Sequence, residues 1–143
     1  MFGRIRPCVA RSALFAAASA ISACSSASGP APAASFPMSL ASDQGALRLA
    51  LDASPNPPAV GTDTFVLTVT NASDGTPRDG LTIGVVPWMP SMGHGTSAPT
   101  VTPLGNGQYR LTDVYLFMPG TWELKTTFSG PVSDHAEPEF EIQ

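Results

Sequence analysis

Cysteine is nearly missing from this chain of 143 residues: there are only two, Cys8 and Cys24, both near the N-terminus. From residue 25 onward the chain has no thiol. A domain in that part has no disulfide and must be held together by its core alone. The same absence excludes a cysteine nucleophile there.

Positive charge is also scarce, with seven Lys and Arg residues against eleven Asp and Glu. Three of the basic residues, Arg4, Arg6 and Arg11, lie in the first eleven positions, and the rest of the chain carries a balance of −7. We therefore expect neither nucleic acid nor anionic lipid head groups as partners.

Long hydrophobic runs are absent as well. The uncharged stretch "SALFAAASAISA" has twelve residues, which is too short to span a membrane as a helix. It follows a segment with three arginines and no acid, so residues 1–23 are predicted to be a bacterial export signal. We therefore expect the protein to act outside the cytoplasm.

The signal ends in "ISAC", which resembles the lipobox of bacterial lipoproteins. The resemblance implies that Cys24 is lipidated and becomes the first mature residue, anchored in a bacterial membrane. The anchored protein would face the periplasm or the cell exterior, and Ser25 favours the outer membrane where one exists. The alternative is simple cleavage at an Ala-x-Ala-like site, without lipid.

Residues 24–45 are dominated by Ser, Ala, Pro and Gly and are predicted to form a disordered tether.

Residues 46–143 are predicted to form one all-β domain, because apolar residues alternate with a period of two between Gly- and Pro-rich turns. We expect an immunoglobulin-like sandwich of about seven short antiparallel strands. No pattern indicates an oligomer. The expected strands are "ALRLALD", "TFVLTVTN", "LTIGVV", "GQYRLT", "VYLFM", "TWELKTTF" and "PEFEIQ".

Motifs for catalysis are missing. There is no GxSxG elbow to support a Ser–His–Asp set around His94 or His135, and there is no phosphate-binding Gly-rich loop. The alternating acids Glu137, Glu139 and Glu141 are typical of a solvated strand face. We therefore do not expect an enzyme.

The segment "WMPSMGHGT" is unusual for a loop, because methionine normally fills cores rather than turns. Met89, Met92 and His94 form a soft donor set that suits Cu(I), with Trp88 as a cap over the bound cation. Met118, in "LFMPGTW", is a possible fourth ligand if both loops lie at one end of the sandwich. The alternatives are that the methionines plug the sandwich and that His94 only bonds a loop carbonyl.

The segments "WMPSMGHGT", "GNGQY" and "LFMPGTWEL" follow one another along the chain. Their motifs and their order resemble those of the YtkA-like family, which is related to FixH. The resemblance covers residues from about 46 to 142 and implies a small exported or membrane-tethered β-sandwich with "MPxMxHG" and "MPGxW" motifs. Members often occur in metal-handling or oxidase-related settings, with copper suspected. The motif positions carried over are Met89, Met92, His94 and Met118, whereas the transmembrane anchor of FixH proteins is replaced here by the predicted lipid.

The functional hypothesis is a lipid-anchored Cu(I) buffer or chaperone that hands copper to a pump, an efflux protein or an oxidase. The alternative is a metal-free adaptor that docks a membrane or periplasmic protein through Trp88 and the methionines. The two differ in one requirement: copper binding needs His94, whereas docking through an apolar surface does not.

Overall fold

The computed structural model describes residues 35–143, so the predicted signal, the predicted lipidation site at Cys24 and the start of the tether lie outside it. Within residues 35–143 all regular structure is β, and no helix there is able to cross a membrane. The strands are β1 (Met38–Ala41), β2 (Leu47–Ser54), β3 (Gly61–Asn71), β4 (Thr82–Met89), β5 (His94–Gly95), β6 (Thr100–Gly105), β7 (Gln108–Leu116), β8 (Gly120–Ser129), β9 (Asp134–Ala136) and β10 (Glu139–Ile142).

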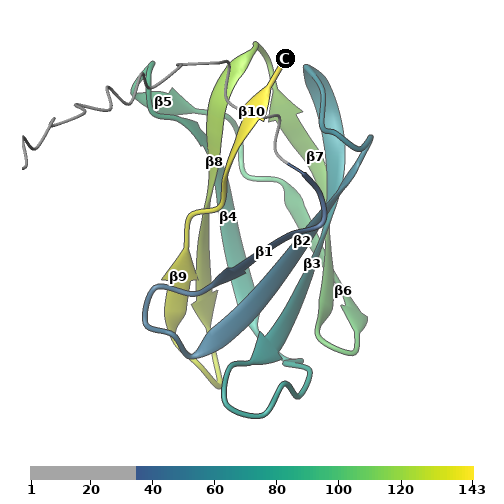
Figure 1. Ribbon diagram of the computed structural model, residues 1–143, viewed down its shortest axis with the longest axis vertical. Coiled ribbons are helices and arrows are strands. Elements are labelled where there is room, and N and C mark those ends of the chain that lie inside the picture. The colour runs from purple at the N-terminus through teal and green to yellow at the C-terminus, as the bar shows by residue number, and fades with distance from the viewer. Residues whose placement is uncertain (1–34) are drawn as a thin grey trace, which may run out of the picture. The chain divides into compact units, whose positions relative to one another are not determined.

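The strands form two antiparallel sheets that face each other (Figure 1). One sheet has the order β1-β2-β3-β7-β6, and the other has the order β10-β8-β4-β5, with β9 also paired to β8. Without β1, β5 and β9, these are the four-stranded and three-stranded sheets of a constant-type immunoglobulin domain. The predicted all-β sandwich is confirmed.

The core explains why these segments are strands. In β2 and β8 every second side chain is buried, so each strand presents one apolar face to the opposite sheet. Trp122, Phe65, Tyr109 and Phe128 are the largest of the fully buried side chains. The sandwich is therefore held by aromatic and aliphatic packing, as a domain without thiols requires.

Strand β7 joins two segments that the sequence predicts as separate strands. Its pairing with β3 shifts between Asp63 and Phe65, and Asp113 in β7 has a φ of 64°. Because of this bulge, the buried residues Leu111 and Val114 are three positions apart instead of two. The alternation is therefore broken, although the strand continues.

The predicted tether extends too far into the sandwich. Residues 38–41, assigned to the tether from composition, form β1 on the edge of β2. Phe36 packs against Phe65 and Phe140, with ring centroids 6.0 and 5.6 Å apart. The folded part therefore includes Phe36, because the alternating Phe36, Met38 and Leu40 pack against the core despite their Ser/Pro-rich surroundings.

A buried carboxylate ties β9 to the turn after β1. Asp134 accepts hydrogen bonds from the Ser42 hydroxyl at 2.5 Å and from the backbone N–H groups of Gln44, Ala46 and His135. Burial alone would raise the pKa of Asp134, but these hydrogen bonds outweigh it and lower the pKa below its ordinary value. The N-terminal edge of the sandwich is thus fixed to its C-terminal strands.

Candidate functional site

The segment "WMPSMGHGT" forms the β4–β5 hairpin at one end of the sandwich (Figure 1). Met89 is paired with His94, and the turn is closed by the N–H groups of Met92 and Gly93, which both donate to the Met89 carbonyl at 3.1 Å. Gly93 has a φ of 68°, a conformation that favours glycine. Because directly paired residues share a sheet face, the Met89 and His94 side chains lie on the same side of this hairpin.

The β7–β8 loop lies against this hairpin, although the two are distant in sequence. The His94 ring stacks on Phe117, with centroids 5.7 Å apart and planes 14° from parallel. A Cβ on Gly120 would lie 3.2 Å from the Met89 Cε, so Met89 packs over the start of β8. The two methionine-containing motifs therefore lie at the same end of the sandwich, as a shared site requires.

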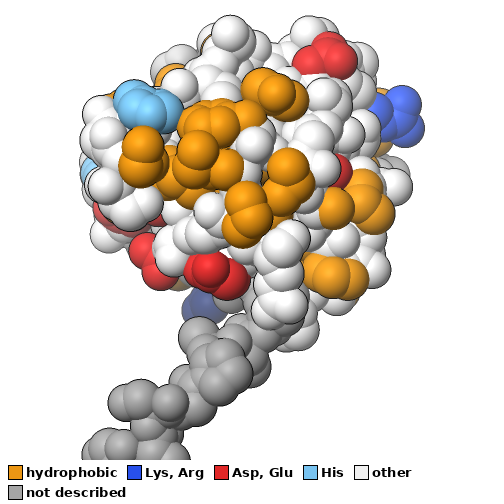
Figure 2. Space-filling view, turned by 90° about the horizontal axis from the view of Figure 1, so that it is seen from above, with side chains coloured by type: hydrophobic (Ala, Val, Ile, Leu, Met, Phe, Trp, Pro, Cys, Tyr) orange, Lys and Arg blue, Asp and Glu red, His pale blue; other side chains and the backbone are white. Residues whose placement is uncertain are grey.

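The four predicted donors differ in their access to solvent. Met89 is 2% exposed and belongs to the core, whereas Met92 is 52% exposed and His94 is exposed. Met118 is half-buried and packs against the core. In Figure 2, which looks down on this end, a histidine borders a group of hydrophobic side chains. Two of the predicted donors, Met92 and His94, are therefore exposed, whereas Met89 is buried and Met118 is half-buried.

The His94 imidazole has no polar partner among the described residues. Among residues 35–143 no hydrogen bond or ion pair involves the His94 side chain; the histidine with an acidic partner is His135, whose Nε2 lies 2.9 Å from Asp43 Oδ2. His135 belongs to β9, away from the hairpin (Figure 1). A ring nitrogen of His94 is therefore available to a ligand.

Trp88 does not lie with the other predicted site residues. It precedes Met89 in β4, and successive side chains of a strand point to opposite faces. The Lys125 Nζ lies 4.6 Å from the centroid of the Trp88 ring, where a bound cation was expected. The predicted cap is thus replaced by a cation–π contact on the outer face of the sheet.

Phe117 is the aromatic residue beside His94, and sequence reasoning did not select it. Its ring meets Trp122 edge-on, with centroids 5.2 Å apart and an interplanar angle of 89°. The signal in the sequence was its place directly before Met118 in "LFMPGTW". Its contact with His94 depends on the pairing of two distant loops, which the sequence pattern does not give.

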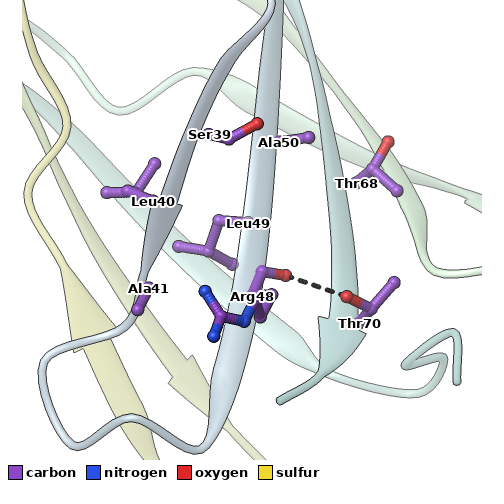
Figure 3. Close-up of a pocket in the computed structure, with 8 residues that line it drawn as sticks. All are labelled: Ser39, Leu40, Ala41, Arg48, Leu49, Ala50, Thr68 and Thr70. Carbon is purple, nitrogen blue, oxygen red and sulfur yellow. Dashed lines mark hydrogen bonds between the residues drawn. The ribbon is translucent and has the colours of Figure 1, made fainter. Parts of the chain in front are cut away.

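Other places in the described part of the chain fit a soft metal ion less well. Residues 35–143 contain no group of three or more His, Cys, Asp or Glu side chains that could hold a metal. The groove of about 460 Å³ in Figure 3 lies over β1, β2 and β3, where Arg48 is the one charged lining residue and the Thr70 hydroxyl donates to the Arg48 carbonyl. It contains no thioether or imidazole.

One comparison with known proteins identifies the family of the chain. The model of the YtkA-like family matches residues 43–127, which is more than half of the chain and includes both the hairpin and the β7–β8 loop. Searches of curated proteins and of solved structures gave no match. The family match covers all four predicted donors, and the chain belongs to the YtkA-like family.

Proposed function

We propose that this protein binds a monovalent soft metal ion, Cu(I), at the end of the sandwich formed by the β4–β5 hairpin and the β7–β8 loop. The observation that carries the proposal is the position of the His94 imidazole. It is exposed, free of hydrogen bonds within residues 35–143, and lies on the same side of the hairpin as Met89. Thioether and imidazole donors suit Cu(I), whereas Mg²⁺ and Ca²⁺ prefer oxygen.

The donors have unequal roles in this proposal. Met92 and His94 are exposed, so they receive the ion first, and Met118 lies at the border of the core. Met89 is a core residue, and its thioether supports the site from below as the inner donor. Trp88 takes no part, because Lys125 lies over its ring.

The exposure of the outer donors suits transfer of the ion better than permanent storage. Copper is therefore cargo in this proposal, received and handed on to a pump, an efflux protein or an oxidase outside the cytoplasm. Lipidation at Cys24 would hold the protein at a bacterial membrane, close to such partners. The charge balance of −7 beyond the predicted signal also suits a cation.

A metal-free adaptor is the second candidate, supported by exposed apolar side chains at the same end. Met92 and Tyr115 are 52% and 51% exposed, and such residues are typical of protein-binding surfaces. The adaptor does not need the imidazole of His94. Replacement of His94 therefore separates the two functions.

The test is an anaerobic titration of the full chain in detergent with Cu(I) against a chromogenic Cu(I) competitor. Wild type, Met92→Leu and His94→Gln are compared, with Met38→Leu and His135→Gln as matched controls. Met38 lies in β1 on the other sheet and His135 in β9. We expect one-to-one binding that both site variants weaken at least about tenfold, equivalent to about 1.4 kcal/mol, and that both controls retain.

Two results would contradict the proposal. If the wild-type protein takes no Cu(I) from the competitor, the copper proposal fails and the metal-free adaptor becomes the favoured function of this end of the sandwich. Binding that His94→Gln and His135→Gln weaken equally would place the ion elsewhere on the protein.

A further inference from the structure

The His94 side chain is held on one side only. Its ring lies nearly parallel to Phe117, at 14°, with centroids 5.7 Å apart, which is an offset stack. No other aromatic ring of the described residues stacks on it, and no hydrogen bond there fixes its orientation. Without Phe117, an exposed imidazole at a hairpin end would sample several rotamers.

Phe117 is in turn held by the core. Its ring meets Trp122 edge-on, and Trp122 is completely buried. The indole Nε1–H of Trp122 donates to the Met118 carbonyl at 3.0 Å, which also fixes the loop that carries Met118. One buried tryptophan therefore positions both Phe117 and the backbone of a predicted ligand.

We propose that Phe117 is a positioning residue for metal binding, which holds the His94 imidazole in the orientation that accepts the ion. This inference rests on the proposed function, because it concerns the same site. Phe117 does not coordinate the metal. It acts through His94, by reducing the rotamer freedom that is lost when the ion binds.

Leucine at position 117 keeps an apolar side chain but removes the ring. Phe117→Leu is therefore expected to weaken Cu(I) binding roughly three- to tenfold, which corresponds to the loss of one aromatic stack. Phe117→Tyr keeps the ring and should retain wild-type affinity. Tyr115→Leu is the matched control, because the Tyr115 ring lies beside Phe117, with centroids 6.3 Å apart, but does not stack on His94.

The second readout needs no metal. In NMR spectra of the metal-free protein, the ring protons of His94 should carry an upfield ring-current shift from Phe117. We expect Phe117→Leu to remove this shift, and Phe117→Tyr and Tyr115→Leu to keep it. Dispersed amide spectra of all variants would exclude misfolding as the cause.

The outcomes separate the inference from the proposed function. Loss of both affinity and shift in Phe117→Leu alone supports the inference. If Phe117→Leu binds Cu(I) as tightly as wild type does, the inference is overturned and the proposed function stands. If wild type itself binds no Cu(I), both are overturned, and the first titration reveals this before any variant is compared.

Discussion

Gly120 is the point at which the two methionine-containing motifs touch, and its replacement by alanine tests that contact. Gly120 has a φ of 128°, and an added Cβ would lie 3.2 Å from the Met89 Cε. Gly61 provides a matched control: its φ is 134°, it also begins a strand, and nothing lies within 4 Å of its Cβ position. Both substitutions carry similar backbone strain, of about 1–3 kcal/mol.

The difference between the two variants measures the contact. Gly120→Ala must also displace the Met89 Cε by a few tenths of an ångström inside a packed core, which costs about 0.5 kcal/mol more. The assay is guanidinium unfolding followed by tryptophan fluorescence, which reports on Trp88 and on the buried Trp122. We expect Gly120→Ala to lower the free energy of unfolding by that extra amount relative to Gly61→Ala, and Met89→Leu, which lacks the Cε atom, to relieve it. Equal losses in the two alanine variants would refute the reasoning.

Three further predictions follow from single contacts. Hydrogen bonds keep the pKa of Asp134 below its ordinary 3.8, so its stabilising contribution is present above that pH and is lost as the pH falls below it. Asp134→Asn should therefore lower the melting temperature more at pH 7 than at about pH 2–3. A decrease that is the same at both pH values would contradict this. The Tyr109 hydroxyl donates to the Arg78 carbonyl and accepts from the Leu81 N–H, so Tyr109→Phe should cost about 1–3 kcal/mol in guanidinium unfolding; no change would contradict it. Trp88→Leu should leave Cu(I) affinity unchanged in the competitor titration, whereas a loss would restore Trp88 as a cap.

The fold class could be predicted from the sequence because period-two burial is a local property. The alternation in β2, β3 and β8 is regular, and each of these segments is a strand of the sandwich. β1 was missed because its composition is that of a tether, and β6 because none of its side chains is buried, so it lacks a period-two apolar pattern. The bulge at Asp113 divided β7 in the prediction, since one extra residue reverses the alternation.

The site could be predicted only in part, and the reason differs for each residue. Met89, Met92 and His94 are close in sequence, so their proximity needed no tertiary information. Trp88 was misplaced because "WM" was taken as loop, whereas β4 continues to Met89 and neighbouring strand residues face opposite sides. Phe117 was not found, because its stack on His94 depends on how the two sheets bring the loops together.

The most direct test of the copper site is the X-ray absorption spectrum at the copper edge of the Cu(I)-loaded full chain. The proposed function predicts that the nearest neighbours of copper are thioether sulfur and imidazole nitrogen. Met92→Leu should reduce the sulfur contribution, and His94→Gln should remove the imidazole signature. A spectrum with oxygen and nitrogen neighbours alone, or one that neither substitution changes, would contradict a Met/His site at this end of the sandwich.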